Sequence, residues 1–410
     1  MLSTQPLALT VSTVRVDEPA PLLSLLPEAG ALAWVSEGEG LVAWGEAARL
    51  ELTGPDRFAR AQAWWAERVA AADVTDAVGL PGTGLVAFGS FAFDETAASS
   101  VLVIPEVLVG RRRGTTWITT VGTATARTTP TVPRPAVGVR FADGSRTPPE
   151  WMSAVADAVR RIERGEVGKV VLARDLVAQL DEPLDPRYPL TRLAATYPAC
   201  WTFLVDGLLG ATPEMLVRLR GGTATSRVLA GTLRRTGDAN KDMRQSDAMA
   251  RSIKDVEEHG YAVRSVADAL ALHCRSLDVP AAPFVLQLAN VMHLASDVTG
   301  TVTDGASSLG LVASLHPSAA VCGTPTEAAL GLIREIEGLD RGRYAGPVGW
   351  MDSAGDGDWG IALRCATIDP QDRRVLRLYA GCGIVAGSVP VRELTESNAK
   401  LVPMRDALTA

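Results

Sequence analysis

The chain has 410 residues, of which 47% are hydrophobic and 21% charged, and its formal net charge is −7 at pH 7. This is ordinary globular composition, with enough apolar residues for one large α/β domain or two to three average ones. The acidic balance argues against a general nucleic-acid-binding protein.

The cysteines and the N-terminal stretch bear on the cellular compartment. An odd number of cysteines without CxxC spacing indicates free thiols in a reducing compartment, and not a disulfide framework or a zinc site. The cysteines are Cys200, Cys274, Cys322, Cys365 and Cys382. The chain begins without a basic segment followed by an apolar core, and it has no run of about 18 apolar residues. We therefore expect a cytoplasmic protein with neither a signal peptide nor a membrane span.

The first third of the chain is typical of strands around one helix. The glycine-punctuated stretch 31–53 predicts short antiparallel strands, and 55–73 predicts a helix. A buried strand is expected at 84–94 and two more strands within 101–125. Residues 128–149 are rich in Pro, Thr, Gly and charge, which predicts a surface connection.

The remainder mixes helices with strands. Helices are predicted at 149–166 and 240–272, and a third opens at the capping-box sequence 324–327. The predicted strands are 169–173, 201–210, 285–301, 346–352, 359–368 and 375–385, with a hairpin over 215–229 that turns at 221–222. Strands joined by hairpins and covered by helices imply a mixed or antiparallel sheet with helices outside.

The stretch 376–400 combines a buried strand, a glycine-rich turn and a helix start. Ser388 is the expected N-cap, with Pro390 near the first turn. The helix carries Glu393, Glu396 and Lys400 at i, i+3 and i+7, which places them on one face. This pattern indicates a site for an anion and a hard cation. The alternative is a solvated helix with one Glu–Lys pair.

Two further ionisable residues stand next to hydrophobic strands. Lys169 begins an apolar strand, and partial desolvation favours the neutral amine, which can act as a base. The alternative is an edge lysine whose amine reaches water. Glu214 follows the strand that ends near 210–213, where burial would make it a general acid. The alternative is an ordinary turn glutamate.

The predicted helix at 240–272 carries a second acidic pair. Asp255 and Glu258 lie at i and i+3, next to His259. Together with Glu393 and Glu396 they would supply four carboxylates from two helices. This arrangement suits Mg²⁺, which prefers one or two carboxylates plus water and substrate oxygens. Two ordinary helix surfaces are the alternative.

Six motifs in this order resemble the chorismate-utilising enzymes, a family that includes isochorismate, salicylate, anthranilate and aminodeoxychorismate synthases. They are KVVLAR at 169–174, GATPEM at 210–215, LAGT at 229–232, KDVEEH at 254–259, LHPSAAVCGTP at 315–325 and the stretch 376–400. The resemblance is strong over 150–405 and weaker over 1–140, where 84–94 matches best. It implies a single α/β (α+β) chorismate-binding domain over 1–410. Two curved, mainly antiparallel sheets would form its centre, with helices outside and a deep active-site cleft.

The resemblance also implies roles for single residues. Lys169 matches the general base for water attack at C2 of chorismate, and Glu214 the general acid that protonates the departing C4 hydroxyl. His293 matches a histidine near that hydroxyl. Glu258 and Glu396 match Mg²⁺ ligands, with Asp255 and Glu393 supporting through water. The implied substrate-binding residues are Thr232, Ala320, Tyr344, Arg364, Gly381, Gly383 and Lys400.

Three positions favour one reaction within the family. Lys169 resembles the water-using members, which differ from the amine-using ones at this position. Ala230 stands where aminodeoxychorismate synthases have lysine, and Ala320 where the pyruvate-eliminating members have threonine. We therefore expect an isochorismate synthase, an isomerase whose product feeds menaquinone, siderophore or salicylate biosynthesis.

Two alternatives stay open: a salicylate synthase on the same scaffold, and a catalytically silent binding protein of this fold. The expected cofactor is Mg²⁺, and the expected ligand is the small molecule chorismate. We expect a monomer without a glutaminase subunit that binds neither nucleic acid nor a membrane.

Overall fold

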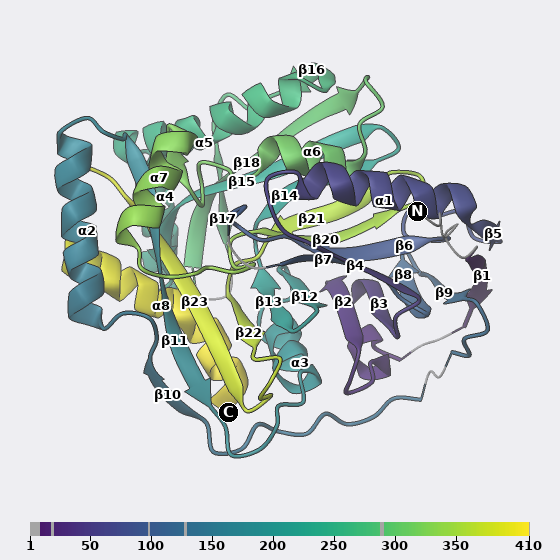
Figure 1. The fold of residues 1–410 in the computed structure, drawn as a ribbon. Helices are drawn as coiled ribbons and strands as arrows, with labels where there is room; N and C mark the ends of the chain where they lie inside the picture. Colours follow the sequence, from purple (N-terminus) through teal and green to yellow (C-terminus); the bar gives the residue numbers. More distant parts are fainter. Residues whose placement is uncertain (1–8, 18–19, 97–98, 127–128, 288–290, 410) are drawn as a thin grey trace.

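The computed structural model describes residues 9–17, 20–96, 99–126, 129–287 and 291–409. Two β-sheets form the centre of the molecule, and helices lie on their outer sides (Figure 1). Neighbouring strands pair antiparallel apart from β1 and β5, which pair parallel. The predicted α/β (α+β) fold with two mainly antiparallel sheets is confirmed.

The first sheet joins strands from all parts of the chain. Its order is β10 (Arg140–Asp143), β11 (Lys169–Gln179), β23 (Val375–Ile384), β22 (Cys365–Ile368), β13 (Leu208–Thr212), β12 (Trp201–Val205), β2 (Ala31–Ser36), β3 (Glu39–Trp44), β8 (Val107–Arg112), β9 (Thr115–Val121), β1 (Thr10–Val16) and β5 (Asp73–Asp76). The short strand β19 (Gly323–Thr324) pairs with β11 beside Lys169.

The second sheet has the order β16 (Cys274–Asp278), β18 (Val291–Val302), β15 (Thr223–Arg234), β14 (Met215–Arg220), β21 (Gly357–Ile361), β20 (Pro347–Asp352), β6 (Val86–Ser90), β7 (Ser100–Ile104) and β4 (Ala48–Leu52). β17 (Phe284–Gln287) pairs with β18. The chain crosses between the sheets from β13 to β14 and again from β21 to β22. Residues 213–214 and 362–364 therefore lie where the two sheets meet.

The helices cover the outer sides of the sheets. They are α1 (Arg57–Ala71), α2 (Pro148–Glu163), α3 (Arg187–Thr196), α4 (Ala239–Ala250), α5 (Ile253–Ala271), α6 (Ser308–Leu315), α7 (Thr326–Ile336) and α8 (Pro390–Thr409), with a 3-10 turn at Leu22–Leu25. α2, α3 and α8 pack on the first sheet, while α5 and α6 pack on the second. The amphipathic pattern in α2 explains its place, because Trp151, Val155 and Ile162 form its buried stripe.

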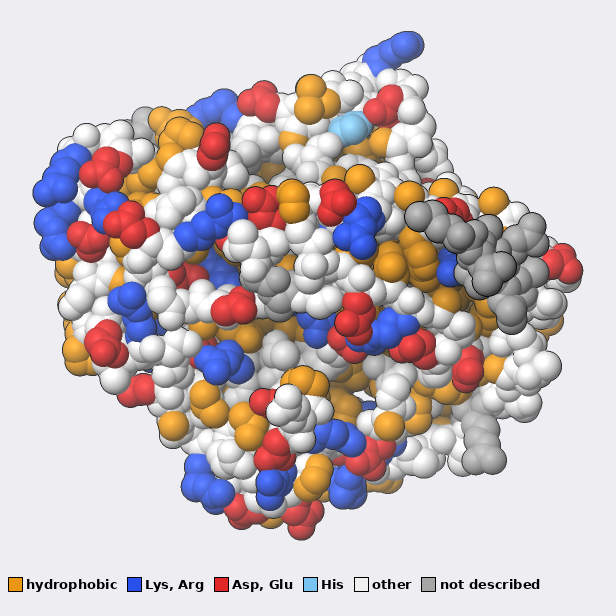
Figure 2. Space-filling view, viewed as in Figure 1, with side chains coloured by type: hydrophobic (Ala, Val, Ile, Leu, Met, Phe, Trp, Pro, Cys, Tyr) orange, Lys and Arg blue, Asp and Glu red, His pale blue; other side chains and the backbone are white. Residues whose placement is uncertain are grey.

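Apolar side chains fill two regions. The larger cluster joins residues of both sheets and buries Trp34, Phe88, Trp117, Trp350 and Trp359 completely. The smaller cluster lies between the first sheet and helices α3 and α8. Charged side chains of both signs are interspersed over the face shown in Figure 2.

Two expectations about the whole chain can be compared with the structure. The five cysteines are free thiols, as expected. Within the described residues, none of the helices has the length and apolar character needed to cross a membrane.

Several predicted elements are divided in the structure. The helix expected over 240–272 is two helices, α4 and α5, because the chain turns at Arg251–Ser252 and the Ser252 carbonyl accepts the first helical bond of α5 from Val256 N–H (3.0 Å). The strand expected over 201–210 is the hairpin β12–β13, which turns at Asp206 and Gly207 in the left-handed region (φ 50° and 77°).

Other predicted strands are also divided into more and shorter strands in the structure. The stretch 101–125 contains β7, β8 and β9 in place of two strands, and 285–301 contains the paired strands β17 and β18. The stretch 359–368 is divided between β21 and β22, which belong to different sheets. The surface connection at 128–149 contains β10 and the start of α2. The hairpin turning at 221–222 is confirmed.

Both predicted helix caps were wrong. Pro325 is the residue before α7, and it has no side-chain bond to the helix, so 324–327 is not a capping box. α8 begins at Pro390, two residues after Ser388. The Ser388 hydroxyl instead accepts a hydrogen bond from Val385 N–H (3.2 Å), which closes the glycine-rich turn.

Candidate active site

A cavity of about 320 Å³ opens where the two sheets meet. It is lined by the start of β11, the glycine-rich end of β23, the two crossovers between the sheets and the first turns of α8. The predicted site residues among its lining are Lys169, Glu214, His293, Ala320, Tyr344, Arg364, Gly381, Gly383, Glu393, Glu396 and Lys400. Residues more than 200 positions apart in the chain thus share one cavity.

Three predicted site residues cannot be compared with this cavity. Thr232 lies on β15, and Asp255 and Glu258 lie on α5, but their side chains fall outside the part that the structure describes. The same holds for the Ala230 side chain. Their predicted roles stay predictions.

The crossover after β13 buries Glu214 at the cavity wall, where the residue is 7% exposed. Its backbone is fixed on both sides, since its N–H donates to Thr212 Oγ1 (3.2 Å) and its carbonyl accepts from Ile361 N–H (3.1 Å). Burial raises the pKa of Glu214 from 4.5 to about 7, although Lys169 and Arg364 oppose the rise. A carboxyl with this pKa carries its proton in a large fraction of molecules at neutral pH and can donate it.

Lys169 enters the cavity from the first residue of β11. Alternation along the strand places Val171 on the same face, and both residues line the cavity. The paired strand β23 contributes glycines here, with Gly383 opposite Val171. A Cβ at Gly381 would lie only 3.0 Å from Tyr344 Oη, so the small residue keeps room for the phenol.

The second crossover supplies a guanidinium, and a phenol lies nearby in the cavity wall. Arg364 is the left-handed residue (φ 48°) between β21 and β22, and its carbonyl accepts from Ala211 N–H (3.3 Å). Tyr344 stacks on Tyr379 with ring centroids 5.0 Å apart. Burial raises the pKa of Tyr344, which keeps its hydroxyl a neutral donor. A guanidinium and a phenol in one cavity can bind a carboxylate.

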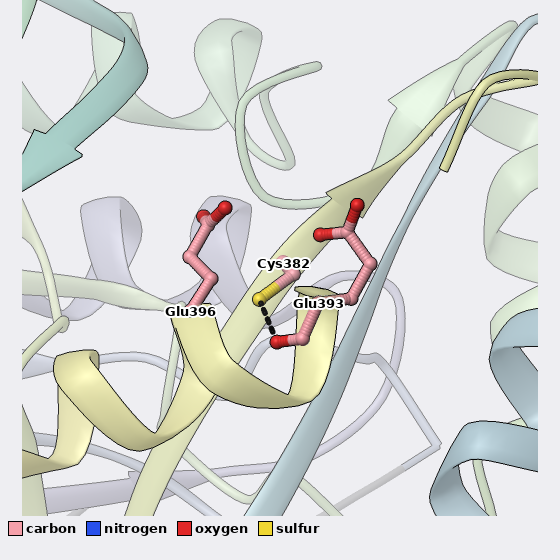
Figure 3. Close-up of side chains that lie close together, drawn as sticks. All are labelled: Cys382, Glu393 and Glu396. Atoms are coloured by element: carbon pink, nitrogen blue, oxygen red, sulfur yellow. Dashed lines mark hydrogen bonds between the residues drawn. The ribbon is translucent and has the colours of Figure 1, made fainter. Parts of the chain in front are cut away.

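The first turns of α8 carry two carboxylates beside Cys382 of β23 (Figure 3). Ligand atoms of Glu393, Glu396 and Cys382 lie within 4.8 Å of one another. The Cys382 thiol donates to the Glu393 carbonyl (3.4 Å), and burial raises the pKa of this thiol to about 12. The thiol therefore stays protonated. Because Mg²⁺ binds oxygen and not sulfur ligands, the donor set fits Mg²⁺ through the two carboxylates.

The Glu–Lys pair considered as the alternative for this helix does exist, but it lies inside the cavity. Lys400 Nζ contacts Glu396 Oε1 at 2.6 Å and donates to the Gly381 carbonyl at 2.8 Å. The Lys400 side chain is only 14% exposed, so the pair is not a feature of a solvated helix face.

Two arginines that the sequence patterns did not single out also line the cavity. Arg392 is an exposed residue in the first turn of α8. Arg341 is buried and paired with Glu337. The i, i+4 spacing of Glu337 and Arg341 was the only local signal of this pair, and that spacing alone predicts a surface ion pair.

The sequence matches a known family over most of its length. The family model described as chorismate binding enzyme matches residues 31–409. The salicylate biosynthesis isochorismate synthase of Pseudomonas aeruginosa is 40% identical over 265 residues, which cover 64% of this chain and 55% of that relative, so the chain spans just over half of its length.

Two other relatives match over more of their length. The putative isochorismate synthase MenF of Mycobacterium tuberculosis is 35% identical over 341 residues, which cover 80% of this chain and 87% of the relative. The crystal structure of a putative 2,3-dihydroxybenzoate-specific isochorismate synthase, DhbC from Bacillus anthracis, superposes with a TM-score of 0.80 at 30% identity and covers 94% of this chain and 98% of that one. The family model over residues 31–409 and these matches show that the chain belongs to the chorismate binding enzyme family.

Proposed function

We propose that this protein is an isochorismate synthase, which converts chorismate to isochorismate with Mg²⁺. The observation that carries the proposal is the pairing of a buried acid, Glu214 with its pKa near 7, and an amine, Lys169, in one cavity. The relatives named isochorismate synthase support the same reaction.

In the proposed reaction Lys169 takes a proton from the water that attacks C2 of the ring. The double bonds shift, and the C4 hydroxyl departs with the proton of Glu214. One water is added and one is lost, so the product is an isomer of the substrate. His293, which also lines the cavity, would lie near the departing hydroxyl. General acid and base catalysis of this kind contributes about 10²–10⁴-fold each.

The cations of the cavity would bind the two carboxylates of chorismate. Arg364 and Tyr344 would hold the enolpyruvyl carboxylate, for which a planar guanidinium is well shaped. Lys400 and the backbone at Gly381–Gly383 would close the site around the ring, with Thr232 against the ring carboxylate. These positive charges in the cavity would attract the dianionic substrate, although the whole chain carries a net negative charge.

Mg²⁺ would be held by Glu258 and Glu396, with Asp255 and Glu393 supporting through water. When bound, the ion would supply positive charge that neutralises the ring carboxylate. The support within the described residues is the pair of carboxylates on α8, which line the cavity and lie near each other beside Cys382 (Figure 3).

Ala320 would stop the reaction at isochorismate, because it offers no hydroxyl to the enolpyruvyl side chain. The test is to incubate the enzyme with chorismate and Mg²⁺, to identify the product by chromatography and NMR, and to assay pyruvate. Isochorismate without pyruvate supports the proposal. Salicylate with pyruvate would identify a salicylate synthase, and no consumption with any divalent ion would identify a silent binding protein.

A further inference from the structure

The strand that carries Lys169 has an unusual edge. β11 pairs with β19 up to Val170 and with β10 only from Leu176 onward. Between them the Val171 N–H donates to the Cys322 carbonyl (2.8 Å), and side chains bond other backbone groups on this edge. Arg341 Nη2 donates to the Val171 carbonyl (2.7 Å), and Ala173 N–H donates to Glu337 Oε2 (2.7 Å). The Glu337–Arg341 ion pair thus makes two of the hydrogen bonds that a neighbouring strand would otherwise make at this edge.

The pair is buried and makes nearly all the hydrogen bonds it can. Arg341 Nε and Nη2 donate to the two carboxylate oxygens of Glu337, each at 2.6 Å. Arg341 Nη1 donates to the Val321 carbonyl (2.9 Å), and the guanidinium lies 4.2 Å from the centre of the Phe93 ring. The two residues are 3% and 2% exposed.

These contacts join three walls of the cavity. Val171 lies two residues after Lys169 on the same face of β11. Val321 follows Ala320, and the Arg341 carbonyl accepts from Tyr344 N–H (2.9 Å). The guanidinium therefore holds the strand of the proposed base and the residue after Ala320, and the backbone carbonyl of Arg341 holds the segment that carries the phenol.

Stability does not explain this choice of residues. A buried ion pair costs desolvation of both charges, and apolar side chains of the same volume often stabilise a protein as well or better. What apolar residues cannot do is bond three backbone groups in fixed directions, because direction comes from the planar fork of the guanidinium and from the carboxylate. The Glu337–Arg341 pair is thus suited to holding the backbone around the cavity in a fixed position.

We propose that Glu337 and Arg341 are positioning residues for the reaction: they set the distance of Lys169 from the substrate and from the wall formed by Ala320. This inference rests on the proposed function. A displacement of about 1 Å in a reacting group can lower the rate by about 10²-fold without loss of binding. Breaking the pair should therefore lower turnover and change product choice in the molecules that still fold.

The test compares three variants with the wild-type enzyme. Arg341→Lys keeps the charge but loses the fork, and Glu337→Gln keeps the volume of its side chain. Arg187→Lys is the matched control, because Arg187 forms an equally buried fork with Asp185 that contacts the Leu26 carbonyl and lies outside the cavity lining. Each variant is assayed for kcat and KM per folded molecule, the ratio of isochorismate to pyruvate, the melting temperature and amide hydrogen exchange over 169–175.

We expect kcat to fall by about 10–100-fold in Arg341→Lys and Glu337→Gln, with KM changed less than about threefold and faster exchange at Ala173 N–H. Pyruvate should rise relative to isochorismate, and Arg187→Lys should leave both kcat and this ratio unchanged. Wild-type kcat and product ratio in the two site variants, or an equal loss in the control, would overturn the inference. If Arg341→Lys does not fold, the kcat and the product ratio of Glu337→Gln decide between these outcomes. A wild-type enzyme that makes no isochorismate would instead refute the proposed function, and the exchange measurement would still report on the pair.

Discussion

Glu214 is the residue whose environment says most about its chemistry. Burial raises its pKa from 4.5 to about 7 in the folded protein, so folding favours the protonated form. The stabilising contribution of this proton is complete below about pH 4.5 and is lost as the pH rises through about 7. In the proposed reaction, the departing hydroxyl would take this proton.

We therefore predict that kcat/KM for chorismate falls as the pH rises through about 7, because kcat/KM reports the free enzyme and Glu214 loses its proton there. Glu214→Gln should lower kcat/KM by about 10²–10⁴-fold and remove this alkaline limb. The measurement is a pH profile of both enzymes at constant ionic strength. An alkaline limb that persists in Glu214→Gln would assign it to another group.

A substitution at Ala320 tests whether the absence of a hydroxyl at this position determines which product forms. Ala320→Thr should keep most isomerase activity and gain a small release of pyruvate, because a hydroxyl that holds the enolpyruvyl group contributes on the order of 1 kcal/mol. That is enough to shift a product ratio and too little to build a lyase. Pyruvate and isochorismate are measured in one reaction mixture. Unchanged products would leave Ala320 as a packing residue.

At the residue scale, the residue pattern alone singled out Lys169, Glu214, Gly381, Gly383, Glu393, Glu396 and Lys400 among the residues that line the cavity, whereas His293, Ala320, Tyr344 and Arg364 came from the family resemblance. Gly381 and Gly383 lie near the end of a buried strand, and Glu214 follows a Thr-Pro pair. Arg341 could not be found in this way. Its backbone partners lie 20 and 170 positions away, and local patterns hold no information about such contacts.

At the scale of elements, most of the predicted helices and strands exist but several were predicted too long, and α3, α6, β1, β5 and β16 were not predicted. The break in 201–210 was visible as the pair Asp206–Gly207, a turn signal that hydrophobicity on both sides concealed. The break in 359–368 was not visible, since Arg364 takes a left-handed conformation that favours glycine and carries no sign of it in its residue type. That second break is what moves the chain from one sheet to the other.

The packing of this crossover leads to a prediction. A Cβ at Gly210 would lie 2.6 Å from the Arg364 carbonyl oxygen and 2.8 Å from Cys365 Cα, so the backbone of the crossover would have to move. Gly210→Ala should lower the free energy of unfolding by about 1–3 kcal/mol, as overpacking does, and should weaken chorismate binding through Arg364. Chemical denaturation and calorimetric titration measure the two effects.

The matched control is Gly331→Ala in α7, where an added Cβ meets no atom within 4 Å. In the middle of a helix this change should be neutral or stabilising. Gly210→Ala with wild-type stability and wild-type chorismate affinity would show that the crossover adapts without moving Arg364.

At the scale of the whole molecule, the cavity exists because the chain passes between the two sheets at β13–β14 and at β21–β22 and because α8 contacts the end of β23. The family resemblance implied this arrangement, and the sequence patterns by themselves did not. Periodicity predicts which face of a strand is buried, but it does not assign strands to one sheet or the other.

Because the first turns of α8 place Glu393 and Glu396 in the cavity lining, we predict that activity depends on Mg²⁺. Activity should be lost with a chelator and restored by Mg²⁺, and Glu396→Ala should weaken Mg²⁺ binding by about tenfold or more. Calorimetric titration with Mg²⁺ alone tests binding apart from turnover, with Glu327→Ala on the exposed start of α7 as the control. Full activity in chelator would reduce Glu396 and Lys400 to an ordinary ion pair.

In the proposed mechanism, Lys169 directs a water molecule to C2 while the C4 hydroxyl departs. Turnover of chorismate in H₂¹⁸O tests this step, with the product analysed by mass spectrometry and NMR. We expect isochorismate that carries one ¹⁸O atom at C2, formed about 10²–10⁴-fold more slowly by Lys169→Ala. Isochorismate without ¹⁸O, or wild-type turnover in Lys169→Ala, would contradict it.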